Sequence, residues 1–355
     1  MEPLYRVVLK KAWHIVKKNP VLWIFGFFAI FLLDGGPLQV FMDTVVAISN
    51  LQSPTSTFAL NLETLALFFI APAGIGGFIL QILRLTVVIL VAFLLLWIII
   101  ASEISIIKST IQLDNKEKPK FIKSLIGAKQ NFFSVLGLHI ISKIITFILI
   151  VGICLPLLIF VVNSSISYRL PIAFVVWVIF LPIAIIISFI FKYAINFVVL
   201  KGEKFSQSIK DAWMVFKTNW MISIEMSIWI LIINLVVGFL LLLITQIVIV
   251  PFDLVALSMV GGGVREIFFT KILPIFLLYV FVGSIVTVFQ ISSWTLLFDR
   301  IVSGKRHSKL VRVIASMSSF MSAKNQISTI ADVNKTAIET PKIVKKRRAG
   351  RPKVK

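Results

Sequence analysis

Residues 75–108 form a strongly apolar run, with only two charged side chains before its end, those of Arg84 and Glu103. A helix needs about 20 apolar residues to cross a bilayer, and this run is long enough. Because water does not reach the bilayer core, the backbone of such a segment must satisfy its own hydrogen bonds, as a helix does. Comparable runs recur along the chain. The sequence therefore predicts an all-α membrane protein that crosses the bilayer several times.

We predict about six transmembrane helices, arranged as three hairpins. They lie near residues 20–40, 78–107, 135–162, 171–200, 220–250 and 272–298. The uninterrupted apolar core of the first covers only residues 21–33, which is short for a span, so a re-entrant segment is the alternative there. The same pattern divides the chain into a polytopic membrane domain (1–305), an amphipathic cytoplasmic helix (306–330) and a disordered basic tail (331–355).

The distribution of charge predicts the orientation of the chain. Hydrophobic residues make up 59% of the sequence and charged residues only 14%, yet the formal net charge is +21. Lys and Arg concentrate in alternate segments, namely 1–20, 109–134, 201–219 and 299–355, whereas the other connecting segments hold only Arg169, Arg265 and Lys271. Basic residues accumulate on the cytoplasmic side of membrane proteins. Both termini are therefore expected in the cytoplasm.

Three of the basic segments share a helical pattern. Each has apolar or small residues at positions i, i+3 and i+7, as in Tyr5, Val8 and Ala12, then Phe121, Ser124 and Ala128, then Phe205, Ser208 and Ala212. A helix with one apolar face, one basic face and Trp at the boundary lies in the headgroup layer. We therefore predict an amphipathic interfacial helix on the cytoplasmic side before each hairpin. Internal repetition explains the pattern, and independent convergence is the alternative.

Basic side chains on these helices and in the tail are candidate contacts for anionic lipid, each contributing about 1 kcal/mol near the membrane surface. They are Lys10, Lys11, Lys17, Lys18, Lys345, Lys346, Arg347 and Arg348. The end of the tail, residues 348–353, also resembles the minor-groove hook of some DNA-binding tails, built on Arg-Gly-Arg-Pro, but Ala349 replaces its first Arg. Salt-sensitive contact with nucleic acid is thus an alternative to lipid.

Two stretches carry a family resemblance. The opening AW…KKNPVLWIFGFF (residues 12–28) and the later F..S…AW..F..NW (residues 205–220) are similar to uncharacterised bacterial multi-pass membrane proteins. Those proteins resemble the membrane domain of glycerophosphoryl diester phosphodiesterases. The resemblance implies a bacterial cytoplasmic membrane and a six-helix bundle. It implies no chemistry, because the phosphodiesterase activity belongs to a separate domain to which nothing in this sequence corresponds.

Ionisable residues within the predicted spans are the candidates for a site, since each is costly in lipid. They are Arg84, Glu103, His139, Lys143, Lys192 and Glu225. Snorkelling to the headgroups or a structural ion pair explains them without function. The functional alternative is a polar cluster that lines a cytoplasm-facing cavity. Asn234, in the middle of a span, favours a hydrogen bond between helices.

The sequence contains no nucleophile elbow, phosphate-binding loop or metal-ligand cluster, so we expect neither an enzyme nor a cofactor. The structural motifs and basic helices favour a non-enzymatic integral membrane protein that organises lipid or partner proteins. The charged residues in the spans favour the alternative, a transporter or permease component. A water-filled cavity that reaches Lys143 would distinguish the second hypothesis from the first.

Overall fold

The structure is a computed structural model that describes residues 4–32, 75–119, 121–154, 166–258 and 273–303. Every regular element in these residues is helical. The longer helices are α1 (Leu4–Lys18), α2 (Val21–Ala29), α5 (Ile75–Asp114), α6 (Phe121–Ile126), α7 (Phe132–Leu149), α9 (Ile166–Asn196), α10 (Phe205–Ser258) and α12 (Leu273–Val302). Short 3-10 or π segments extend them: η1 (Ile30–Leu32), η2 (Gly127–Gln130), η3 (Ile150–Cys154) and η4 (Phe197–Lys201). The predicted helix at 306–330 and the basic tail lie outside the described residues.

Five helices are long and apolar enough to cross a membrane, namely α5, α7, α9, α10 and α12. Among the described residues, α1 and α2 together could supply a sixth span, but they bend by 109° at their junction. The chain is thus a multi-pass membrane protein, as the length and composition of its helices predict. Residues 33–74 lie outside the described part, so full crossing by the first span stays a prediction.

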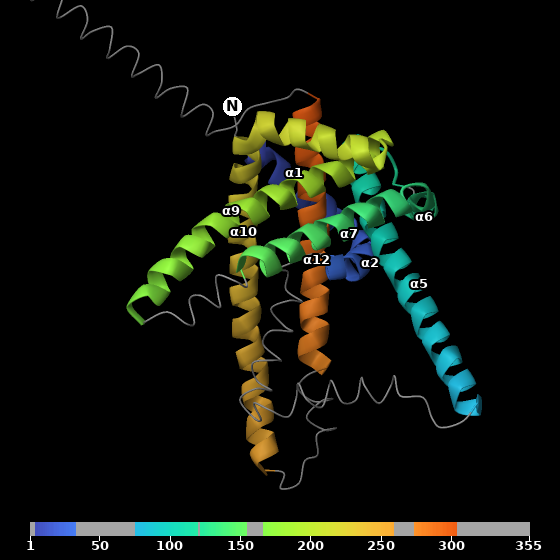
Figure 1. The fold of residues 1–355 in the computed structure, drawn as a ribbon, viewed down its shortest axis with the longest axis vertical. Helices are drawn as coiled ribbons and strands as arrows, with labels where there is room; N and C mark the ends of the chain where they lie inside the picture. The colour runs from blue at the N-terminus through green and yellow to red at the C-terminus, as the bar shows by residue number, and fades with distance from the viewer. Residues whose placement is uncertain (1–3, 33–74, 120, 155–165, 259–272, 304–355) are drawn as a thin grey trace, which may run out of the picture. The chain divides into compact units, whose positions relative to one another are not determined.

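Helix α12 is the centre of the helix packing. Of its most apolar window, 61% is buried, against 11–29% for the other four candidate spans. Successive helices α2, α5, α7, α9, α10 and α12 each contact the next, and α12 closes the series by contacting α2. In Figure 1, α10 and α12 run side by side, whereas α7 and α9 cross them obliquely.

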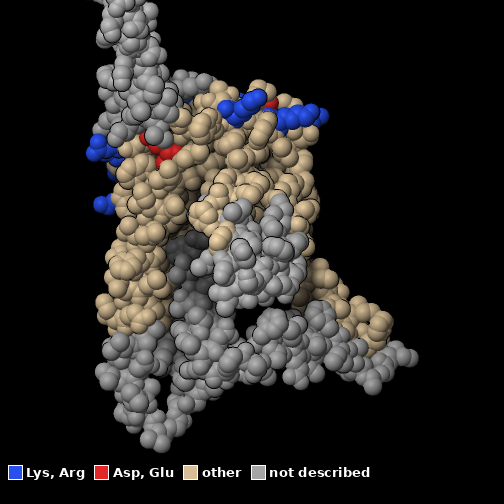
Figure 2. All heavy atoms as spheres, turned by 60° about the vertical axis from the view of Figure 1, so that its left-hand side comes forward, with Lys and Arg blue, Asp and Glu red and all other residues tan. Residues whose placement is uncertain are grey.

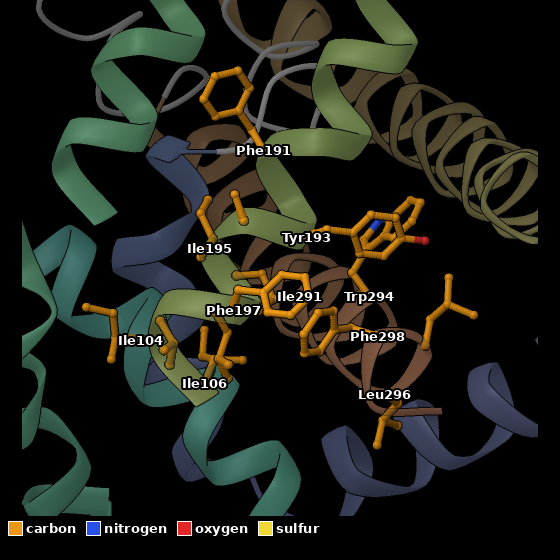
Figure 3. Close-up of a cluster of buried hydrophobic side chains, with 14 of the residues drawn as sticks. Ile104, Ile106, Phe191, Tyr193, Ile195, Phe197, Ile291, Trp294, Leu296 and Phe298 are labelled. Atoms are coloured by element: carbon orange, nitrogen blue, oxygen red, sulfur yellow. The ribbon is translucent and has the colours of Figure 1, made fainter. Parts of the chain in front are cut away.

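The core lies where the C-terminal parts of α5, α9 and α12 meet (Figure 3). Aromatic rings dominate it: Trp294 of α12 lies 5.3 Å from Phe189 and 6.1 Å from Tyr193 between ring centroids. Phe298 packs edge-on against Phe197 at 4.7 Å. Edge-on and offset contacts of this kind add to the area that the rings bury. Many of the buried residues of the described chain lie at this end of the bundle.

An asparagine marks the end of each amphipathic segment. Asn219 has non-helical backbone angles (φ −129°, ψ 25°) and interrupts α10, and its Nδ2 donates to the Val215 carbonyl at 2.9 Å. Asn19 makes the equivalent bond to the Ile15 carbonyl at 2.8 Å, between α1 and α2. Asn131 separates η2 from α7. An Asn side chain can satisfy a carbonyl freed where a helix ends. The side-chain bond forms at two of the three junctions, and the internal repeat stays a prediction.

The apolar face of α1 corrects one expectation. The sequence predicts that this face lies in the headgroup layer, but Leu4, Val8, Ala12, Ile15 and Val16 are buried inside the protein. Helix α1 packs against α12, α5 and α10. The periodicity identified the apolar face correctly, but protein covers it instead of lipid.

Candidate functional site

Glu103 and His139 form a contact between two candidate spans. The Nε2 atom of His139 on α7 lies 2.7 Å from Oε2 of Glu103 on α5, a hydrogen bond and, with a protonated imidazole, an ion pair. The exposed fractions of the two side chains are 19% and 11%. Burial of a carboxylate is tolerated where a hydrogen-bonded partner compensates for lost water. Of the six predicted residues, these two are therefore brought directly together.

The other four predicted residues lie in different environments. Arg84 is exposed and precedes Glu103 by 19 residues of continuous helix, about 28 Å along α5, so it cannot join a cluster with Glu103. Lys143 is exposed on α7. The ammonium of Lys192 stands 4.7 Å above the ring of Trp294, a cation–π contact. Glu225 is buried in α10, and it has an interaction partner, as do Arg84 and Lys143.

Three hollows among the described residues show what the bundle could hold. None is lined by any of the six predicted residues. The largest of the three, of about 520 Å³, is an apolar groove between α9 and α10, and its lining includes Phe189, Phe216 and Trp220. The second, of about 350 Å³, is a polar cleft beside the start of α10. The third, of about 290 Å³, lies between α1, α10 and α12 and is apolar. The expected polar cavity near Lys143 is not among these three.

The predicted lipid-contacting lysines also separate into two groups. Lys11 makes a salt bridge with Asp114 at the end of α5, at 2.6 Å, and its contact with lipid stays a prediction. Lys10, Lys17 and Lys18 are exposed on α1. On the face shown in Figure 2, the described Lys and Arg side chains gather at one end of the molecule. The four basic residues predicted at 345–348 lie outside the described part.

The structure pairs several polar residues of different helices whose partners could not be predicted from the sequence. The predicted bond of Asn234 is confirmed, because Gln290 of α12 donates to its Oδ1 at 2.7 Å. The hydroxyl groups of Thr110 and Ser292 lie 2.9 Å apart, joining α5 to α12. Interhelical hydrogen bonds of this type stabilise membrane bundles modestly. These polar residues in candidate spans therefore have structural roles.

The polar cleft contains two carboxylates, Glu203 and Asp211. Burial raises the pKa of Glu203, the nearby charge of Asp211 raises it further, and Lys201 partly opposes this. One carboxylate oxygen of Glu203 is buried without a hydrogen-bond partner among the described residues. Asp211, by contrast, accepts two bonds from Gln207 at 3.0 and 3.1 Å. The ionised form of Glu203 is thus disfavoured in the folded protein.

We expect Glu203→Gln to raise the midpoint of thermal unfolding at about pH 8 and to leave it nearly unchanged at about pH 4. A carboxyl group with a raised folded-state pKa favours folding while protonated, and that contribution disappears as the pH rises through the folded pKa. Thermal unfolding of both proteins in detergent, at each of the two pH values, would measure the change in midpoint. Glu117→Gln, at an exposed position, is the control for loss of one surface charge. An equal gain in both variants would contradict the prediction.

The geometry thus comprises one partly buried Glu–His pair, two apolar grooves, one polar cleft and exposed lysines on α1. The chain matches no family model, no curated protein and no solved structure.

Proposed function

We propose that this chain is a non-enzymatic protein of a bacterial cytoplasmic membrane that organises lipid, with partner proteins as further ligands. The observation that carries this proposal is the packing around α12. Side chains of the neighbouring helices cover the buried face of α12. The hollows of about 520 and 290 Å³ between helices are apolar. Apolar grooves on a bundle accept acyl chains more readily than polar solutes.

The polar residues of the spans support the same proposal. Transport of a polar solute requires a hydrated route lined by groups that replace its water. In the described part, Glu103 and His139 pair with each other, and Asn234 pairs with Gln290. A transporter or permease component is the second candidate, and the buried Glu103–His139 pair is the observation that favours it, since ionisable pairs inside membranes often serve proton or ion pathways.

The orientation is part of the proposal. Basic residues concentrate in alternate connecting segments of the sequence, which favours cytoplasmic N- and C-termini. The gathering of Lys and Arg at one end of the face in Figure 2 agrees with this. On that assignment, the exposed residues Lys10, Lys17 and Lys18 of α1 face the cytoplasmic leaflet, where anionic lipids attract them.

Native mass spectrometry of the protein released from its own membranes tests the two candidates. For a lipid-organising protein, we expect phospholipid to be retained through purification in mild detergent, and retained equally by wild type and Glu103→Gln. For a transporter, we expect a polar small molecule to be retained and then lost in Glu103→Gln. Retention of no phospholipid under conditions that preserve the fold would overturn the first candidate.

A further inference from the structure

We propose that the groove between α1, α10 and α12 is a binding site for one anionic phospholipid. Its acyl chain occupies the groove, and the positive charges of Arg6, Lys10 and Lys17 on α1 attract its headgroup. The inference deepens the proposed function and rests on it, because it names the lipid class and the residues that select it.

The groove has the shape and composition that an acyl chain requires. It measures about 290 Å³, close to the roughly 300–1,000 Å³ of ordinary ligand pockets, so it accommodates a chain segment. Apolar side chains line it, contributed by three helices: Leu9 and Trp13 from α1, Ile233 and Val237 from α10, and Ile285, Val286 and Phe289 from α12. Burial of each methylene group there is favourable.

Helix α1 carries a row of cations on the face that includes Trp13, one of the residues that line the groove. Arg6, Lys10, Trp13 and Lys17 are spaced i, i+4, i+7 and i+11, so they lie along one face of a regular helix. All four are exposed. Trp13, whose ring lies 6.2 Å from that of Phe289, belongs both to this row and to the groove lining. The cationic row and the apolar groove therefore meet at one residue.

The charge of this row is suited to a phosphate. Helix α1 contains no acidic residue that could neutralise it. Asp114 forms a salt bridge with α1, but its partner there is Lys11. Lys11 lies about 100° around the helix from Lys10 and therefore on a different face from the row. An Arg and two Lys within one helix face attract an anionic headgroup, and Trp prefers the boundary between headgroups and chains. An anionic phospholipid suits both the apolar groove and the cationic row, whereas a zwitterionic phospholipid is attracted less strongly by the cations.

The test compares lipid bound to the full-length protein in micelles that contain equal amounts of phosphatidylglycerol and phosphatidylcholine. Native mass spectrometry gives the ratio of the two bound lipids. We expect wild type to prefer phosphatidylglycerol, and the triple variant Arg6→Gln, Lys10→Gln, Lys17→Gln to lose roughly tenfold or more of that preference. The matched control is Lys118→Gln, Lys123→Gln, Lys129→Gln, which removes the same charge from exposed positions near α6 and should keep the preference.

A second variant keeps the inference testable if the triple variant folds poorly. Val237→Trp fills the groove and leaves every charge in place, so we expect it to displace one bound phosphatidylglycerol. Inorganic phosphate at equal concentration should not compete, since it has no chain. Equal loss in the triple variant and its control, or full binding in Val237→Trp, would overturn the site. Wild type that retains phospholipid without dependence on these residues refutes only this inference, whereas wild type that retains none refutes the proposed function.

Discussion

Replacing His139 with leucine is expected to destabilise the bundle by about 1–3 kcal/mol, the usual cost of leaving a buried polar group without its hydrogen-bond partner. The imidazole lies 2.7 Å from the Glu103 carboxylate, whose side chain is only 11% exposed. Leucine has a similar volume to histidine and suits a membrane span. The loss of stability would therefore come from the Glu103 carboxylate, left without its partner, and not from a cavity. Equilibrium unfolding of the purified protein in mixed micelles would measure the change in free energy.

The double variant Glu103→Leu, His139→Leu separates the pair from the packing. Replacing both members of a buried pair by apolar residues is often neutral or stabilising. We therefore expect the double variant to recover most of the lost stability. Lys143→Met is the control for removing a cation from α7, and a small effect is expected there because Lys143 is exposed. A double variant as unstable as His139→Leu would show that the Glu103–His139 contact is not the cause.

The long helices follow from the sequence because hydropathy is a local property. Residues 75–108 are apolar for longer than a bilayer is thick, and α5 indeed runs from Ile75 to Asp114. The bends could also be anticipated in part, since Asn19 and Asn219 occupy equivalent positions in two similar segments. Asn131 was found only in the structure, because the second segment is shorter and its spacing differs.

The partners of the charged residues could not be predicted in the same way. Glu103 and His139 are 36 residues apart, and their contact depends on how α5 and α7 cross. The sequence placed Arg84 in the same set, but the length of α5 separates it from Glu103. Only the register between helices determines which span residues meet, and no local pattern encodes that register.

Whether protein or lipid covers an amphipathic face likewise depends on tertiary packing. The sequence identified Val8 and Ala12 as members of one face of α1, and both have no exposed surface. A headgroup layer and a neighbouring helix bury the same apolar residues, so periodicity alone does not distinguish them. The small side chain of Ala12 was the available signal, because small residues let helices approach closely in membranes.

Gly26 is a position where two helices approach each other closely. Helix α2 contacts α12 there, and a Cβ atom built on Gly26 would overlap the Ser284 carbonyl oxygen and stand 2.7 Å from Cγ2 of Val288. The obstacle is partly backbone, which cannot rotate away. Gly26→Ala should therefore push α2 from α12 and cost about 1–3 kcal/mol, the usual penalty of overpacking. Unfolding in mixed micelles again provides the measurement.

Gly238→Ala is the matched control, since it makes the same substitution within α10, where nothing lies within 4 Å of the new Cβ. Alanine is favoured over glycine inside a helix by about 0.5–1 kcal/mol, so this variant should be neutral or more stable. The two substitutions are thus expected to act in opposite directions. If Gly26→Ala also stabilised the protein, α2 could not pack on α12 through this residue, and the closure of the helix series by α12 and α2 would be wrong. Because α2 belongs to the sixth candidate span, that result would also separate this span from α12.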